Sequence, residues 1–285
     1  DCEDGAPVGG EAEHAALVTE LALATQAARA DARIAVRVHP VDHPSFETDM
    51  SHIAGRAGRV LTHIMVPKVE SVVDVNRVEA ALAAAGAAHL PVHVLIESPA
   101  AVHQAFDIAA HPRVQSISFG LMDFVSAHAG AIPAEGMGIH GQFTHPLVLR
   151  AKLEIASACH AHGKVPSHCV VTEFKNTDAI RSAAQKAARE LGYTRMWSIH
   201  PDQIRPILEA MAPSEAQIDQ ASQIILAAQA VNWAPISHAG QLHDRASYRF
   251  FWQLIERAHQ TGRHLPAPMQ ALFDVAPANV ELSLS

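Results

Sequence analysis

Two acidic residues follow short apolar stretches that we expect to be neighbouring strands. Glu97 comes after VHVLI, and Asp123 comes after QSISFGLM, one helix further along. Acidic residues are poor strand formers, so a glutamate directly after a strand indicates a function there. Active sites gather at the carboxyl ends of parallel strands, where two carboxylates suit a hard cation. We therefore expect Glu97 and Asp123 to bind Mg²⁺; the alternative is a buried carboxylate that pairs with an arginine or caps a helix.

Three further features lie at the same expected strand ends. Arg37 alternates with valines in IAVRVHP, which places it on one face of a strand, where it is either functional or a structural ion-pair partner. Lys68 ends the next strand; read alone, it could be the Schiff-base lysine of a metal-free aldolase, but the two carboxylates would then have no role. The backbone amides of Gly120, Leu121 and Met122 open a helix and could bind a substrate carboxylate.

Alternating short strands and helices position these residues. The seven expected strands are DCEDG, IAVRVHP, THIMVPKVES, VHVLIES, QSISFG, KVPSHCVV and RMWSIHP. This alternation predicts a parallel sheet wrapped by helices, and the lack of an early GxGxxG turn disfavours a dinucleotide fold. An α/β fold of the (β/α)₈ TIM-barrel type fits best, with one strand overlooked or the chain starting inside the barrel.

The pattern changes after Met211. A helix over residues 214–231 is followed by a loop, PISHAGQLHD, and by an amphipathic aromatic helix over residues 248–259, with no strand expected. We expect a catalytic barrel over residues 1–211 and a C-terminal helical extension over residues 212–285. The aromatic helix could pack on its own barrel or be exchanged onto a neighbouring subunit.

Composition excludes several classes of protein. The net charge of −8, without any Lys/Arg cluster, disfavours nucleic acid or an anionic membrane as partner. No apolar run has the length of a membrane span. The three cysteines lack metal-ligand spacing and fit a reducing cytoplasm, and the 20 histidines form no zinc motif. We therefore expect a cytoplasmic protein. The sequence contains no signal peptide, but Asp1 resembles an internal start, so a signal could lie upstream of it.

Seven motifs follow one another along the chain in this order: DCEDGAP, AVRVHP, VPKVES, LIESP, SFGLMDF, WSIHPDQI and GQLHD. Over essentially the whole chain they resemble the citrate lyase β-subunit-like branch of the HpcH/HpaI aldolase family. The resemblance implies a (β/α)₈ barrel with a C-terminal helical segment, Mg²⁺ dependence and a homotrimer or hexamer. The DCED-like motif belongs to the family's second strand, so the first strand is missing here, which implies a longer natural chain or a neighbour that covers the gap.

The implied activity is reversible carbon–carbon cleavage of 3-hydroxyacyl thioesters such as citryl-, citramalyl- or malyl-CoA. The resemblance makes Glu97 and Asp123 the metal ligands and Arg37 the residue that binds the substrate carboxylate and stabilises an enolate. Glu3 and Asp4 match a second acidic pair, expected to hold metal-bound waters or to orient Arg37.

Two other residues take roles from the resemblance. Lys68 would act electrostatically or as a hydrogen-bond donor. Asp244, in GQLHD, matches an aspartate that reaches a neighbouring subunit's active site as an acid/base; the alternative is an N-cap for the helix that follows.

The sequence departs from the family at two places. PSHCVV stands where many relatives have an aspartate-containing strand, and Thr194 and Arg195 stand in place of a Gly-Lys pair. Two other functions therefore stay open: an aldolase acting on a free 2-keto acid, and a subunit of a larger lyase without turnover of its own.

Overall fold

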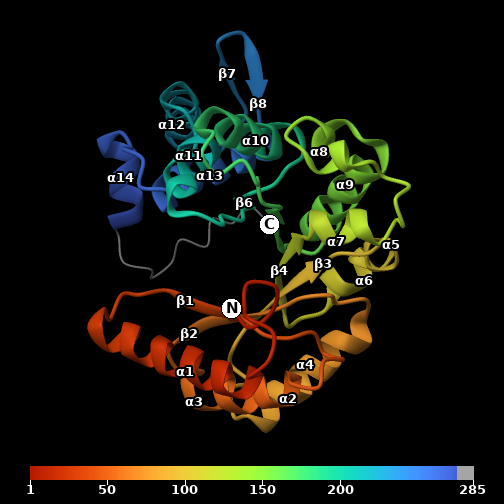
Figure 1. Cartoon of the computed structure of the whole chain (residues 1–285). Helices are drawn as coiled ribbons and strands as arrows, with labels where there is room; N and C mark the ends of the chain where they lie inside the picture. The colour runs from red at the N-terminus through yellow and green to blue at the C-terminus, as the bar shows by residue number, and fades with distance from the viewer. Residues whose placement is uncertain (275–285) are drawn as a thin grey trace. The chain divides into compact units, whose positions relative to one another are not determined.

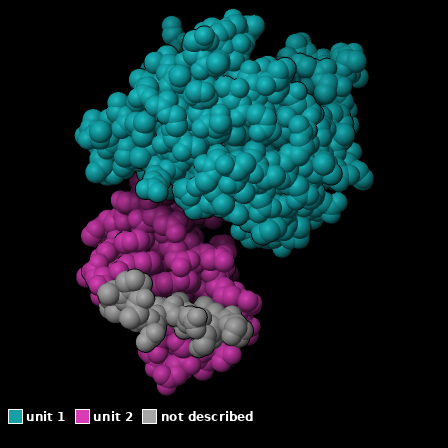
Figure 2. Space-filling view, turned by 90° about the horizontal axis from the view of Figure 1, so that it is seen from below, with its two compact units in different colours: residues 1–207 teal, residues 208–285 magenta. Residues whose placement is uncertain are grey.

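The structure is a computed structural model that describes residues 1–274 (Figure 1). It has two compact units, Asp1–Ile207 and the residues from Leu208 onward, which are coloured separately in Figure 2. The boundary that we expected after residue 211 stays a prediction, and residues 275–285 of the expected extension lie outside the described residues.

The first unit contains a sheet of six parallel strands, which follow one another across the sheet in chain order. They are β1 (Ile34–Arg37), β2 (Leu61–Val66), β3 (Val92–Ile96), β4 (Val114–Phe119), β5 (Val165–His168) and β6 (Arg195–Met196). Chain-order neighbours and helical crossovers are the arrangement of a TIM barrel, so the α/β prediction is confirmed with six strands instead of seven or eight.

Two of the expected strands differ from the prediction. DCEDG is not a strand: only the Cys2 amide joins β1, by donating to the Arg37 carbonyl oxygen at 2.8 Å. One such bond forms no ladder, because the turn after Glu3 takes the chain away from the sheet. RMWSIHP contributes only Arg195 and Met196 to the sheet, although the Trp197 amide adds one bond to the His168 carbonyl oxygen at 3.0 Å.

Helices precede, connect and follow the strands of this sheet. They are α1 (Glu11–Ala28), α2 (Phe46–Asp49), the π-helix Met50–Ala54, α3 (Gly55–Ala57), α4 (Val72–Ala84), α5 (Pro99–His103), α6 (Ala105–Ala110), α7 (Leu121–Ser126), the 3₁₀-helix Ala134–Met137, α8 (Gly141–Thr144), α9 (Pro146–Ala161), α10 (Thr177–Glu190) and α11 (Pro201–Met211). At the start of α4, Asp74 Oδ2 accepts hydrogen bonds from the amides of Glu70 and Ser71 at 2.9 and 3.1 Å.

The apolar core lies between the outer face of the sheet and these helices. Val36, Ile64, Val94 and Ile117 belong to one buried cluster that also contains side chains of α1, α4, α6 and α9. These strand residues alternate with others that point the opposite way. The strands are therefore held from outside by hydrophobic packing.

The inner face of the sheet, in contrast, carries mostly polar side chains. Its residues line a cavity of about 270 Å³. They include Ala35, Arg37, His63, Met65, His93, Ser116, Ser118, Ser167, Arg195 and Trp197. The sheet curls around this cavity, since the Arg37 guanidinium carbon, on edge strand β1, lies 5.5 Å from the ring centre of Trp197, next to edge strand β6.

Two inner-face histidines stack on each other across β2 and β3. The ring centres of His63 and His93 are 3.5 Å apart, and His93 Nε2 is 2.8 Å from Gln115 Oε1. Burial lowers the pKa of His63 to about 3, with help from His93 and Arg195. Burial likewise lowers the pKa of His93 to about 4. Both rings are therefore neutral at physiological pH.

The second unit is a helical body with a small hairpin. It contains α12 (Glu215–Ala230), β7 (Ile236–His238), β8 (Gln241–His243), α13 (Arg245–Gln260) and α14 (Ala267–Asp274). The prediction that no strands follow Met211 was wrong: β7 and β8 pair antiparallel around Ala239 and Gly240, which both have positive φ. The tight turn brings two short polar segments into register despite their weak strand propensity.

Side chains of α12 and α13 form the core of this second unit. Tyr248 is fully buried, and its hydroxyl donates to the carbonyl oxygens of Ala234 and His243 at 2.8 and 3.1 Å. Within residues 1–274, no helix has both the length and the apolar character needed to cross a membrane.

Candidate active site at the carboxyl ends of the strands

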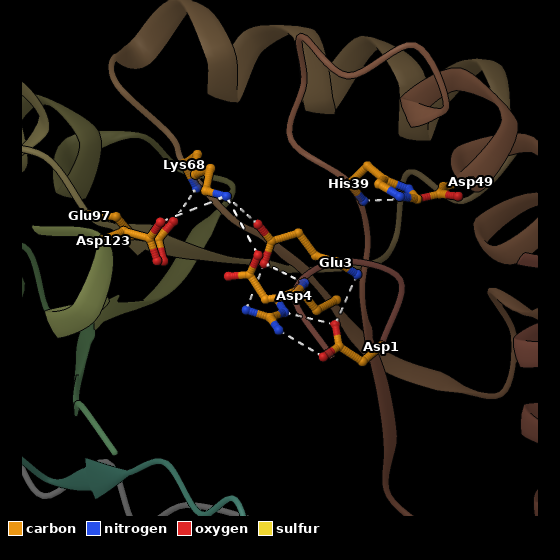
Figure 3. A network of polar contacts seen from close by, with 9 residues as sticks. Asp1, Glu3, Asp4, His39, Asp49, Lys68, Glu97 and Asp123 are labelled. Carbon is orange, nitrogen blue, oxygen red and sulfur yellow. Dashed lines mark hydrogen bonds and ion pairs between the residues drawn. The ribbon is translucent and has the colours of Figure 1, made fainter. Parts of the chain in front are cut away.

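Glu97 follows β3 directly and is the most deeply buried carboxylate of the site. It is 4% exposed, and its Oε2 accepts a hydrogen bond from the Lys68 amide at 2.9 Å (Figure 3). Burial, together with the charges of Asp123 and Glu3, raises the pKa of Glu97 to about 8. The negative charge of such a carboxylate is poorly compensated by its neighbours, and a bound cation would favour the ionised form of Glu97.

Glu97 packs directly against the turn that carries the second carboxylate. A Cβ added to Gly120 would overlap the Glu97 side chain, so only glycine admits the glutamate side chain here. Asp123 lies three residues on, in the first turn of α7, and its side chain is 39% exposed. The close turn thus brings the two carboxylates together at the ends of β3 and β4.

Lys68 connects this pair to the acidic residues at the start of the chain. Its Nζ lies 2.6 Å from Glu3 Oε1, 3.8 Å from Asp4 Oδ1 and 3.9 Å from Asp123 Oδ1. Burial lowers the pKa of Lys68, but the hydrogen bond to Glu3 and the neighbouring carboxylates outweigh burial and raise it. Lys68 is therefore a cation, which disfavours a Schiff-base nucleophile and agrees with an electrostatic role.

The backbone of Lys68 is unusual. Its φ of 52° lies in the left-handed region, which residues other than glycine rarely adopt. This turn lets the amide of Lys68 face Glu97 while its side chain extends toward Glu3.

Arg37 ends β1, and its guanidinium group contacts Asp1, Glu3 and Trp197. Its Nε and Nη2 donate to the two carboxylate oxygens of Asp1 at 2.8 and 2.7 Å, and Nη1 lies 2.9 Å from Glu3 Oε2. The guanidinium carbon lies over the face of the Trp197 ring, 5.5 Å from its centre. The side chain is only 14% exposed, so its position is well defined.

Glu3 bridges the two cations and is itself buried. Its side chain is 5% exposed. Burial raises the pKa of Glu3, but the hydrogen bond from Lys68 and the charge of Arg37 outweigh burial and lower it. Burial and the neighbouring Glu3 raise the pKa of Asp4, whose side chain is 58% exposed. Carboxylates thus outnumber cations at this site.

The arrangement fits Mg²⁺ better than a metal that needs a complete protein cage. Among residues 1–274, no group of three or more His, Cys, Asp or Glu side chains could hold a metal ion by itself. Mg²⁺ is typically bound by one or two carboxylates, with waters and substrate oxygens completing its octahedron. Glu97 and Asp123, with excess negative charge around them, satisfy that requirement.

The structure brings six of the predicted site residues together: Glu3, Asp4, Arg37, Lys68, Glu97 and Asp123. Their roles stay predictions. The Gly120 amide donates to the Ile96 carbonyl oxygen at 2.9 Å and so belongs to the sheet. Of the three amides proposed for a substrate carboxylate, those of Leu121 and Met122 are the remaining candidates.

Asp244 belongs to the second unit, where it caps α13. Its Oδ1 accepts hydrogen bonds from the amides of Ala246 and Ser247 at 3.0 and 3.4 Å. The N-cap geometry is therefore present, and an additional acid/base role stays a prediction.

Two residues of the site were not predicted from the sequence. Asp1 forms the bidentate pair with Arg37, and the Trp197 ring makes a cation–π contact with it. Period-two alternation from Arg195 would have placed Trp197 on the inner face of the sheet. No local pattern could have paired Asp1 with a side chain 36 positions away.

Comparisons with known proteins find one family model and several similar proteins. A family model described as HpcH/HpaI aldolase/citrate lyase matches residues 1–201. An L-malyl-CoA/beta-methylmalyl-CoA lyase from Cereibacter sphaeroides is 30% identical over 237 residues, which cover 76% of this chain and 73% of that protein. The crystal structure of a citrate lyase from Burkholderia xenovorans LB400 has 47% identity and a TM-score of 0.84, with 96% of this chain and 86% of that chain covered.

A more distant structure has the same fold. The CitE protein from Mycobacterium tuberculosis, solved in complex with magnesium, acetoacetate and coenzyme A, is 20% identical with a TM-score of 0.65. The match covers 91% of this chain and 88% of that one.

Proposed function

Because this chain belongs to the HpcH/HpaI aldolase/citrate lyase family, we propose that it is a Mg²⁺-dependent lyase that cleaves a 3-hydroxyacyl-CoA of the malyl-, citramalyl- or citryl-CoA type. The observation that carries the proposal is the buried Glu97 beside Asp123, within one cluster with the cations Lys68 and Arg37. Carboxylates to hold a metal and a fixed guanidinium to stabilise an anion are what this cleavage requires.

The reaction breaks the bond between C2 and C3 of the thioester. A base takes the proton of the 3-hydroxyl, the C–O bond becomes a carbonyl, and the electron pair of the C2–C3 bond moves into the thioester enolate. Protonation of the enolate at C2 releases the acyl-CoA product. For malyl-CoA, the products are glyoxylate and acetyl-CoA.

Residues of this chain would divide that work. Glu97 and Asp123 would hold Mg²⁺, which when bound supplies Lewis-acid polarisation of the oxygens of the 2-oxo acid. Arg37, fixed by Asp1 and Glu3, would present its remaining N–H donors and its charge to the enolate or to a substrate carboxylate. Lys68 would add positive charge beside Asp123.

The test is turnover of defined thioesters by the isolated protein. Malyl-CoA, citramalyl-CoA and citryl-CoA are each supplied with Mg²⁺, and acetyl-CoA and the oxo acid are measured together. We expect equal amounts of both products, loss of turnover with EDTA, and recovery with added Mg²⁺. Free CoA in place of acetyl-CoA would indicate hydrolysis and would contradict the proposal.

The same assay separates the two other functions. Cleavage of a free hydroxy acid without CoA would favour the aldolase acting on a 2-keto acid. Turnover that begins only when an acyl-carrier partner is added would favour a subunit of a larger lyase. The assembly into a homotrimer or hexamer and the cytoplasmic location stay predictions. Analytical ultracentrifugation measures the assembly.

A further inference from the structure

Trp197 lies at the mouth of the inner cavity and contacts two residues of other strands. Its ring centre is 5.5 Å from the Arg37 guanidinium carbon, within the range of a cation–π contact. Its indole Nε1 donates a hydrogen bond to Ser118 Oγ at 3.0 Å. Trp197 thus joins a side chain of β1 to a side chain of β4.

The indole is itself held in place. The Trp197 amide bonds to the His168 carbonyl oxygen, so its backbone extends the pairing of β5 and β6. Ser118 is 1% exposed, in the middle of the sheet. With its backbone and its ring nitrogen both bonded, Trp197 has little freedom to leave Arg37.

Arg37 needs such a support. Asp1 and Glu3 bind the edges of the guanidinium, which restrains it within its own plane. Neither contact prevents a tilt out of that plane, and the Asp1 side chain is 38% exposed. The Trp197 ring, over which the guanidinium carbon lies, supplies a third contact that opposes such a tilt.

We propose that Trp197 is a positioning residue of the active site: locked by Ser118, its indole holds the Arg37 guanidinium in the orientation in which it meets the substrate. The kinetic part of this inference rests on the proposed lyase function. The contact between Trp197 and Arg37 itself does not.

The first experiment measures the contact without turnover. Unfolding equilibria are compared for Arg37→Met, Trp197→Leu and the double variant. Methionine keeps most of the length of the side chain and removes the cation, so each single variant removes the cation–π contact. We expect the combined effect on the unfolding constant to be about 2- to 5-fold smaller than the product of the two single effects, which corresponds to an ordinary cation–π contact. Arg37→Met combined with Tyr193→Phe, which only removes the hydrogen bond from the Tyr193 hydroxyl to the Lys152 carbonyl oxygen, is the control and should show no coupling.

The second experiment measures turnover with conservative variants that keep the fold. Trp197→Leu should lower kcat about 10- to 100-fold, because a misplaced catalytic group is that costly, while Mg²⁺ affinity stays within about twofold. Trp197→Phe and Ser118→Ala remove the same hydrogen bond, so each should lower kcat about 2- to 10-fold and their combination no further. Ser167→Ala is the matched control, since Ser167 Oγ is buried on the same inner face with no hydrogen-bond partner in residues 1–274.

The outcomes separate this inference from the proposed function. Coupling in the unfolding cycle, together with a loss in kcat that Ser118→Ala reproduces, supports the positioning role. If the unfolding cycle shows coupling between Arg37 and Trp197 but the protein has no lyase turnover, the proposed function is refuted and the contact is supported. Absence of coupling, or a Trp197→Leu protein with wild-type kcat, overturns the inference.

Discussion

At the scale of single residues, the site depends on one glutamate placed where its charge is unfavourable. Glu97 lies among other carboxylates with a pKa of about 8, and the Lys68 amide is its hydrogen-bond donor. A bound Mg²⁺ would relieve this repulsion. Burial of this charge thus costs free energy, which a bound cation would offset.

The first prediction concerns the two proposed ligands. Glu97→Gln and Asp123→Asn should each weaken Mg²⁺ binding at least about tenfold, because each removes one anionic ligand. Glu97→Gln should leave stability unchanged or raise it, since the variant removes a buried carboxylate among like charges. Isothermal titration calorimetry and thermal unfolding measure the two effects.

The control for this prediction is Glu70→Gln, which changes an exposed carboxylate bonded to Ser98. It should bind Mg²⁺ like the wild type. Unchanged Mg²⁺ affinity in both Glu97→Gln and Asp123→Asn would refute the metal assignment.

The sequence predicted which side chains gather at this site but not how they are held. Glu97, Asp123, Arg37 and Lys68 could be placed because each follows a recognisable strand. The Asp1–Arg37 pair could not be predicted, since it depends on the hydrogen bond from the Cys2 amide to the Arg37 carbonyl oxygen, which places the start of the chain beside the end of β1.

At the scale of elements, the turn between β4 and α7 decides whether the two carboxylates can meet. Gly120 has an ordinary φ of −92°, so the requirement for glycine comes from the contact with Glu97 and not from backbone strain. Sequence alone indicated a glycine at a strand end, whereas its reason required the position of a side chain from the neighbouring strand.

The second prediction follows from that contact. Gly120→Ala should displace Glu97, lower Mg²⁺ affinity at least about tenfold and destabilise the fold by about 1–3 kcal/mol through overpacking. Gly55→Ala is the matched control: its added Cβ meets nothing closer than 3.7 Å, so both properties should stay near the wild type. A Gly120→Ala protein with normal Mg²⁺ affinity would show that Glu97 is not held where we describe it.

The third prediction concerns the stacked histidines of β2 and β3. Their folded pKa values, about 3 and about 4, lie below the ordinary value of 6.5, so below that value the unfolded chain binds more protons. The stability from the neutral rings is therefore complete above pH 6.5 and is lost as pH falls toward 4 and then 3. The loss is up to about 1.4 kcal/mol per pH unit for each histidine.

Chemical unfolding at a series of pH values measures this loss. His93→Gln should flatten the slope between pH 6.5 and 4, whereas His103→Gln, at an exposed position of α5, should keep it. Equal slopes in the wild type and His93→Gln would contradict the neutral buried ring.

The strand prediction succeeded for long β-branched runs and failed for short ones. VHVLI and VQSISF became β3 and β4 as expected. The hairpin of β7 and β8 was missed because ISH and QLH are three residues each and are stabilised by their pairing and by packing on α12 and α13, not by propensity.

At the scale of the whole molecule, Asp244 is the predicted site residue that belongs to the second unit. Its cap geometry and its proposed acid/base role make different demands on the side chain. Asparagine is as good a cap as aspartate but is no acid or base, whereas alanine is neither.

The fourth prediction uses this difference. Asp244→Ala should lower stability by about 1 kcal/mol, and Asp244→Asn should keep most of it. If Asp244 is the acid/base, Asp244→Asn should still lose about 10²- to 10⁴-fold in kcat. Thermal unfolding and turnover with malyl-CoA give both answers, and a fully active Asp244→Asn would leave Asp244 as a cap alone.

The separation of the two faces of the sheet has a consequence for how such a chain can change over generations. The apolar cluster that holds the strands lies on the outer face, while the inner face consists largely of serines, histidines and other side chains around the cavity. Serine and alanine at several inner positions bury little apolar area, so substitutions at those positions leave the folded state intact. Related chains can therefore differ at these inner positions and still share the fold that the outer face stabilises.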